Sequence, residues 1–120
     1  MIKLIKDLPD DVLGFEATGI VTGEDYETVL IPAVEKELKK YPKLKLLFHM
    51  GSGFTSYEMK ALWDDTKIGL GHLRAWERIA LVSDIDWIRS AMHMFGFMIP
   101  GHIRVYKSDE ISDAKKWLAE

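Results

Sequence analysis

Hydrophobic positions along the chain follow two periods, one typical of strands and one typical of helices. Residues 2–6 and 12–21 alternate between apolar and polar side chains, as half-buried strands do. The second segment places four apolar residues on one face: Leu13, Phe15, Ala17 and Val21. A short polar turn, Leu8-Pro-Asp-Asp11, separates the two segments. The pattern predicts an antiparallel hairpin at the edge of a sheet.

Three later segments also have the character of strands. Residues 44–50 and 78–82 are almost continuously apolar, which suits strands covered by helices on both faces of a parallel sheet. Residues 102–106 form the last predicted strand.

Helical periodicity fills the intervals between these strands. The run Thr22-Gly-Glu-Asp25 has the form of a capping box and predicts a helix to about Lys40, with a kink near Thr28 because Pro32 lies inside it. Two further helices are predicted over 56–70, after a glycine-bearing loop at 51–54, and over 84–98. The last helix carries its apolar residues on one face: Ile111, Ala114, Trp117 and Leu118.

The predicted order is therefore β-β-α-β-α-β-α-β-α in a single domain of residues 1–120. Strands that alternate with helices imply right-handed crossovers and an α/β fold. We expect a mostly parallel five-stranded sheet with one antiparallel edge and four helices.

Composition narrows the classes of function. The chain has 120 residues, a formal net charge of −3 and no cysteine, and its charges are mixed along the sequence. No basic stripe is available for nucleic acid, no apolar segment is long enough to span a bilayer, and no secretory signal precedes the first strand. The four histidines have no metal-site spacing. We expect a cytoplasmic protein without metal or cofactor.

Several residues in order resemble the SpoIIAA-like family of the STAS superfamily. They are Tyr26, Pro32, Trp63-Asp-Asp-Thr-Lys-Ile-Gly-Leu70, Arg78-Ile-Ala-Leu-Val82, Asp86-Trp87, Ile103-Arg-Val-Tyr106 and Ala114-Lys-Lys-Trp-Leu118. The resemblance implies a STAS-like fold and a small, non-enzymatic domain that acts by binding. STAS regulators switch partners when a serine at the start of the helix after the third strand is phosphorylated. Here that region, Gly53-Phe-Thr-Ser-Tyr-Glu58, lacks the aspartate and the following glycine of the family motif.

The stretch Ser90-Ala-Met-His-Met-Phe-Gly-Phe-Met-Ile-Pro-Gly101 has two interpretations, core or contact surface. On a helix most of its apolar residues share one side, and methionines also recur on adaptable binding surfaces. The leading hypothesis is an apolar cleft between helices 56–70 and 84–98 for a small hydrophobic or lipid-like ligand such as a fatty acid. Its expected ligand-binding residues are Trp63, Trp87, Met94, Phe97, Met98 and His93, and either His93 or Ser52 would be the polar contact for a head group.

The alternative hypothesis is a regulatory interaction module that works as a dimer. In it the second apolar face of helix 56–70, marked by Tyr57 and Ile68, would meet a partner or a second copy. Transient membrane contact through Arg74, Trp76, Arg78 and the apolar loop 97–99 is a further possibility.

Hydroxyl residues after the third strand allow three interpretations. Ser52, Thr55 and Ser56 form a plain connection, an anion site at a helix start, or a site of phosphorylation. A nucleophile and base at Ser52 and His49 is the enzymatic hypothesis, but no orienting acid and no G-x-S-x-G elbow accompany them. We therefore expect no catalytic residues.

Overall fold

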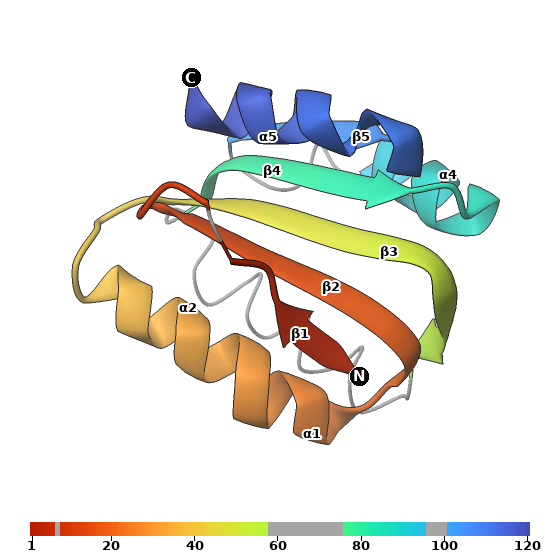
Figure 1. Cartoon of the computed structure of the whole chain (residues 1–120), viewed down its shortest axis with the longest axis horizontal. Coiled ribbons are helices and arrows are strands. Elements are labelled where there is room, and N and C mark those ends of the chain that lie inside the picture. The colour runs from red at the N-terminus through yellow and green to blue at the C-terminus, as the bar shows by residue number, and fades with distance from the viewer. Residues whose placement is uncertain (7, 58–75, 96–100) are drawn as a thin grey trace.

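The computed structural model describes residues 1–6, 8–57, 76–95 and 101–120. Five strands form one sheet in sequential order (Figure 1). They are β1 (Ile2–Leu4), β2 (Val12–Val21), β3 (Leu44–Tyr57), β4 (Trp76–Ser83) and β5 (His102–Tyr106). β1 pairs with β2 in antiparallel orientation, and the other neighbours are parallel. The predicted mostly parallel sheet with one antiparallel edge is confirmed.

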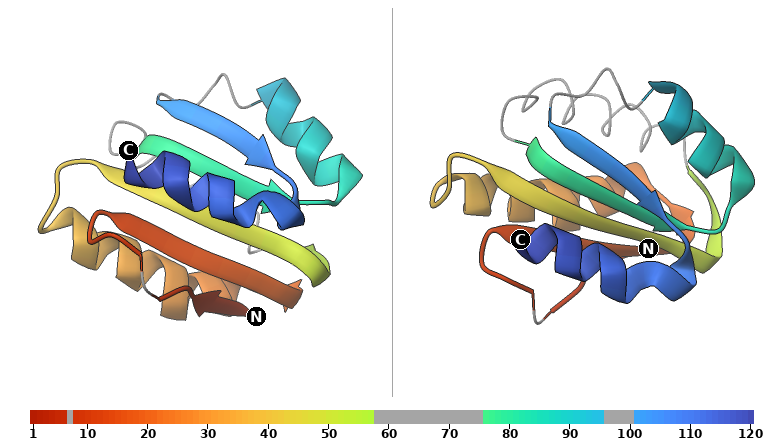
Figure 2. Two further views of the ribbon diagram at one scale, coloured as in Figure 1. Left: turned by 45° about the horizontal axis from the view of Figure 1, so that its top comes forward. Right: turned by 90° about the horizontal axis from the view of Figure 1, so that it is seen from above.

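Helices cover both faces of this sheet (Figure 2). One face carries α5 (Ile111–Ala119), which follows a short 3-10 turn, η4 (Ser108–Glu110). The opposite face carries the helical run after β2 and the helix α4 (Asp86–Phe95). That helical run consists of α1 (Gly23–Asp25), a π-helical turn η1 (Tyr26–Leu30) and α2 (Ile31–Leu38).

The two faces bury separate hydrophobic clusters. Val12, Leu47, Ala80 and Val82 pack under the buried face of α5. Phe15, Phe48 and Leu81 belong to the larger cluster on the opposite face, which includes residues of η1, α2 and α4. Burial on both sides explains why β3 and β4 have nearly continuous apolar runs. The predicted apolar residues of the last helix lie as expected, with Ala114, Trp117 and Leu118 buried.

The start of the first helix follows its sequence signals. Thr22 Oγ1 accepts from the amide of Asp25 at 3.1 Å, and Asp25 Oδ2 accepts from the amide of Thr22 at 2.9 Å, so the capping box is present. Pro32 lies in the first turn of α2, directly after the π-helical turn. A proline ring crowds the carbonyl four residues earlier, here Thr28. The wider turn of η1 places the irregularity at Thr28, where the sequence predicted a kink.

The predicted loop 51–54 and the helix start at Ser56 are wrong. β3 continues to Tyr57, and its extension pairs with the end of β2 through Gly19↔Phe54, Ile20↔Ser56 and Val21↔Tyr57. Phe54 is buried in this extension. Pairing with the long β2 strand stabilises the extended backbone, and this tertiary contact outweighs the local helix-start signal. The pairing of β2 with β3 shifts its register on either side of Gly19, between Ala17 and Gly19 and again between Gly19 and Ile20.

Candidate functional site

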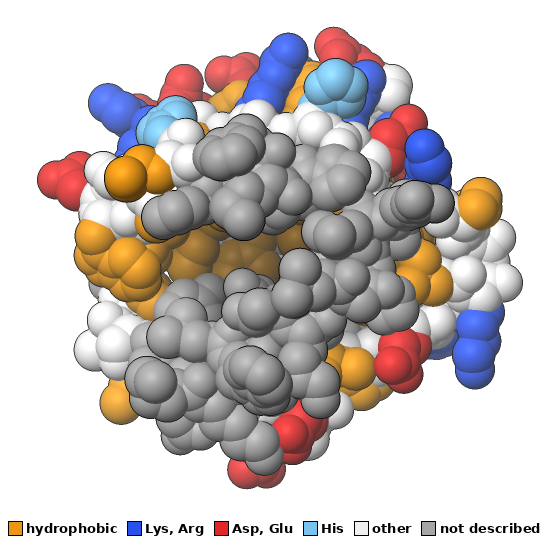
Figure 3. Space-filling model, turned by 180° about the vertical axis from the view of Figure 1, so that it is seen from behind, with side chains coloured by type: hydrophobic (Ala, Val, Ile, Leu, Met, Phe, Trp, Pro, Cys, Tyr) orange, Lys and Arg blue, Asp and Glu red, His pale blue; other side chains and the backbone are white. Residues whose placement is uncertain are grey.

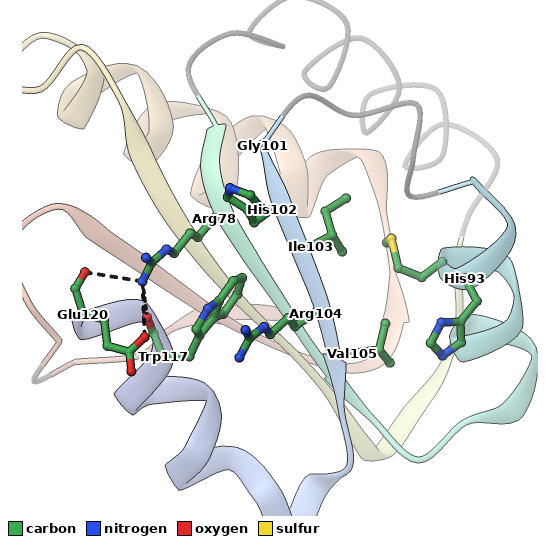
Figure 4. Close-up of a pocket in the computed structure, with 10 residues that line it drawn as sticks. Arg78, His93, Gly101, His102, Ile103, Arg104, Val105, Trp117 and Glu120 are labelled. Atoms are coloured by element: carbon green, nitrogen blue, oxygen red, sulfur yellow. Dashed lines mark hydrogen bonds and ion pairs between the residues drawn. The ribbon is translucent and has the colours of Figure 1, made fainter.

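A groove of about 580 Å³ follows β5, the strand at one edge of the sheet (Figure 4). β4, β5, α4 and α5 supply its lining. The residues that line it are Arg78, Met92, His93, Gly101, His102, Ile103, Arg104, Val105, Trp117 and Glu120. Five of these residues are consecutive, so the groove takes in both faces of β5 and not one face alone.

The side of the groove next to α5 is cationic. The indole ring of Trp117 lies between two guanidinium groups, with Arg104 Cζ 4.7 Å and Arg78 Cζ 5.4 Å from the ring centroid. Trp117 is itself buried at 6% exposure, whereas Arg104 and the neighbouring His102 are exposed. Cations over an indole face gain from the ring quadrupole. Trp117 therefore fixes the position of a positive charge at an open surface.

Arg78 is held in place by the end of α5. Its guanidinium donates to the Trp117 main-chain oxygen at 2.6 Å and to the Glu120 main-chain oxygen at 3.3 Å, and it lies 3.8 Å from the Glu120 carboxylate. The buried Lys45 also donates to the Glu120 main-chain oxygen, at 3.2 Å. The Trp117 main-chain oxygen also accepts from the Glu120 amide at 3.4 Å, and cations at a helix C-terminus add to this hydrogen bonding and interact favourably with the helix dipole. Arg78 is thus mainly structural, and Arg104 is the more available cation of the groove.

The other side of the groove is apolar. Ile103 and Val105 point to the face of β5 that packs toward α4, where they are partly buried with Met92. His93 is exposed at the end of the groove, as Figure 4 shows. The groove therefore offers an apolar wall and a cationic wall separated by the backbone of one strand.

Gly101 fixes the start of β5 at one end of the groove. Its φ is +100°, and a side chain there would place Cβ 2.6 Å from the Trp76 main-chain oxygen and 2.9 Å from that of Glu77. Only glycine accommodates both the conformation and the close approach to β4.

Helix α4 shows where the structure places the predicted ligand contacts. Ile88 is buried and Met92 partly buried, which confirms that this side of the helix is core. Trp87 and Met94, two of the predicted ligand contacts, are 58% and 65% exposed. The core interpretation of the stretch from Ser90 is therefore wrong for Met94, and both side chains are accessible, as a contact role requires. His93 is exposed on the same helix.

The other predicted site residues are separated from α4 or lie elsewhere in the chain. Thr55 and Ser56 are exposed on the extension of β3, so no helix start of the described chain presents their hydroxyls. Ser52 and Tyr57 also belong to β3. Four predicted residues, Trp63, Ile68, Phe97 and Met98, lie outside the described residues.

His49 has polar partners that the sequence did not reveal. Its Nδ1 lies 3.9 Å from Glu16 Oε1, and its Nε2 lies 3.4 Å from Ser108 Oγ. Glu16 is the residue paired with His49 across β2 and β3, so only the strand register identifies it. The amide of Ser108 donates to Asp84 Oδ1 at 3.0 Å. His49 therefore links β2 and β3 to the start of η4.

In the described part of the chain, no cluster of three or more histidine, cysteine or acidic side chains gathers where a metal ion would bind. No helix described in the structure has the length and apolar character needed to cross a bilayer. Trp76, one of the residues considered for membrane contact, is buried at 6% exposure and packs in the core.

Comparisons with known proteins agree with this architecture. The family model described as SpoIIAA-like matches residues 12–119. A crystal structure of an uncharacterised protein from the DUF3478 family with a SpoIIAA-like fold, from Shewanella loihica PV-4, superposes with a TM-score of 0.76. The two share 26% sequence identity, over 98% of this chain and 92% of the other. No curated protein matches the chain.

Proposed function

The chain belongs to the SpoIIAA-like family, and on that premise we propose that it is a binding module for a small apolar or amphipathic ligand such as a fatty acid. The SpoIIAA-like fold supports a non-enzymatic regulatory module. The ligand would lie against α4, on the side of the sheet opposite α5.

The exposure of Trp87 and Met94 carries this proposal. The two residues are seven positions apart, so they lie two turns apart on nearly the same side of α4. Full burial of a large apolar side chain gains about 1.5–3 kcal/mol, and covering the exposed part of Trp87 and Met94 with an apolar ligand would gain a fraction of that for each residue. A helix with its core side already packed and two large apolar residues in solvent favours a further apolar contact.

Hydrophobic side chains of the described residues are also visible on the face seen from behind (Figure 3). His93 lies between the exposed Trp87 and Met94 in sequence and reaches the groove along β5. We propose His93 as the polar contact for a head group. The remaining predicted contacts, Trp63, Phe97 and Met98, stay part of the same hypothesis.

Native mass spectrometry of the purified protein, followed by mass analysis of its organic extract, tests the proposal. We expect a stoichiometric apolar molecule that is released on denaturation. Titration with the fluorescent fatty acid cis-parinaric acid then measures the site after extraction. A ligand-free dimer that does not bind the probe would instead support the regulatory interaction module.

Surface substitutions assign the binding site. We expect the double variant Trp87→Ser/Met94→Ser to weaken cis-parinaric acid binding about tenfold or more, since it removes apolar contact area. The matched control is Leu4→Ser/Ile20→Ser, which removes two similarly exposed apolar residues at the opposite end of the sheet order. Equal weakening in both double variants would show that the probe adsorbs to apolar surface in general and would refute the assignment to α4.

A further inference from the structure

We propose that the outer edge of β5 docks an extended acidic segment of a partner protein, which joins the sheet as an additional strand. The site adjoins the ligand site proposed on α4, since His93 borders both, but it does not use Trp87 or Met94. The backbone of β5 would form hydrogen bonds with the partner segment, and the side chains on the two walls of the groove would select its sequence.

The edge position of β5 supplies the first argument. β5 pairs with β4 on one side, and none of the described residues forms a strand on its other side. An edge strand presents a row of backbone donors and acceptors that another extended chain can satisfy. The opposite edge of the sheet, β1, covers only Ile2–Leu4. β5 is therefore the longer of the two edges.

The shape of the groove supplies the second argument. Residues on one face of a strand alternate, so a pocket on one face would be lined by every second residue. Gly101 to Val105 line this groove without interruption, and α4 and α5 contribute on either side (Figure 4). A space of that form runs along the strand edge, where an added strand would lie.

Charge selects an acidic partner. His102 and Arg104 are exposed on the same face of β5, although the chain as a whole has a net charge of −3. Arg78 already interacts with Glu120, whereas Arg104 has no carboxylate partner among the described residues. Opposite charges on neighbouring strands stabilise pairing, and like charges destabilise it. A second copy of β5 would bring further arginine and histidine to this edge, so a partner with acidic side chains fits better.

The apolar wall of the groove favours apolar residues at every second position of the partner segment. Ile103 and Val105 project to the other face of β5, where Met92 lines the groove. Successive residues of an added strand also point to opposite faces. A segment that alternates acidic and apolar residues would place its acids beside His102 and Arg104 and its apolar side chains beside Met92.

Fluorescence anisotropy with a labelled peptide of sequence Glu-Val-Glu-Val-Glu-Val tests this docking site on the full chain. We expect saturable binding that weakens as salt is added. Hydrogen-exchange mass spectrometry should show slower exchange over 102–106 when the peptide is bound. The same peptide N-methylated at every residue keeps its charges but loses its amide donors, and we expect its affinity to fall about tenfold or more. Equal affinity of the methylated peptide, or no binding of the parent, would overturn the proposal.

Charge reversal on the protein provides the matched comparison. We expect Arg104→Glu to weaken binding of the alternating peptide by about five- to tenfold. Lys39→Glu makes the same change of charge at an exposed position beyond α2 and should leave affinity unchanged. Equal effects of both variants, or equal binding of a Glu-Glu-Glu-Val-Val-Val peptide, would show non-specific attraction and reject strand addition. The Trp87→Ser/Met94→Ser variant should still bind the peptide, so this test and that of the apolar ligand can fail independently.

Discussion

Arg78 donates from its guanidinium to the main-chain oxygen of Trp117 at 2.6 Å, and this bond joins the interior strand β4 to the last turn of α5. The same guanidinium lies 5.4 Å from the centre of the Trp117 ring. Arg78 thus contacts both the backbone and the side chain of Trp117. The cationic wall of the groove depends on this pair, because Trp117 in turn supports Arg104.

Replacing Arg78 by methionine should destabilise the protein. The substitution keeps an apolar stem but removes the donors to the carbonyl oxygens of Trp117 and Glu120. Hydrogen bonds from a charged group of this kind contribute about 2 kcal/mol, so we expect Arg78→Met to lower the free energy of unfolding in urea by about that amount. Lys115→Met, at an exposed position of α5, should change it by less than about 0.5 kcal/mol. Equal losses would mean that the helix end does not need Arg78.

Two glycines with positive φ separate the cost of backbone strain alone from the cost of strain combined with a steric clash. Gly101→Ala should cost at least about 3 kcal/mol of unfolding free energy, since its Cβ would meet the Trp76 main-chain oxygen at 2.6 Å in addition to the conformational strain. Gly19 has a φ of +60° with no atom within 4 Å of the added Cβ, so Gly19→Ala should cost about 1 kcal/mol from the conformation alone. Urea denaturation of both variants checks the order. A smaller loss at Gly101 would show that β4 moves aside without cost.

The order of strands could be predicted because burial on two faces leaves a strong signal in the sequence. The runs at 44–50 and 78–82 match buried parts of β3 and β4. The extension of β3 could not be predicted in this way. Gly51 and Gly53 suggest a loop, and Thr55 suggests a helix start, but the partner that keeps this segment extended is Gly19 to Val21, far away in sequence. Long-range pairing of this kind has no local signature.

The candidate site could also be predicted only in part from the sequence. Periodicity groups the apolar residues of α4 on one side, but it does not show which of them another layer covers, and Met94 is 65% exposed. The groove along β5 was missed, although Arg104 and His102 alternate with Ile103 and Val105 in the sequence. That alternation predicts a strand, and only the strand order shows that β5 is an edge.

His49 should not support ester hydrolysis. Its distances to Glu16 and Ser108 are longer than those of a working acid, base and nucleophile. The amide of Ser108 donates to Asp84, whose negative charge would oppose the oxyanion that forms on the carbonyl oxygen of an ester attacked by the Ser108 hydroxyl. We expect wild type, His49→Ala and Ser108→Ala to give the same background rate with p-nitrophenyl butyrate. Activity in the wild type that both substitutions abolish would contradict a non-enzymatic role.

Asp25 should make the stability of the first helix dependent on acid pH. Burial acts to raise the pKa of Asp25, but hydrogen bonds from the amide and hydroxyl of Thr22 and the charge of the Met1 amine outweigh it, so the pKa lies below its ordinary value of 3.8. A carboxylate with a depressed pKa in the folded state stabilises that state above the unfolded pKa. The contribution is lost as the pH falls through the folded pKa.

The variant Asp25→Asn tests this relation, since it removes the charge and disturbs the capping box. We expect it to be about 1 kcal/mol less stable than wild type at about pH 6. The difference should shrink as the pH falls below about 4 and through the lowered pKa of Asp25, because the wild-type carboxylate then becomes protonated. Urea denaturation at several pH values measures it, with Glu35→Gln, an exposed position on α2, as the control. A difference that stays constant over this range would mean that Asp25 stabilises the helix without its charge.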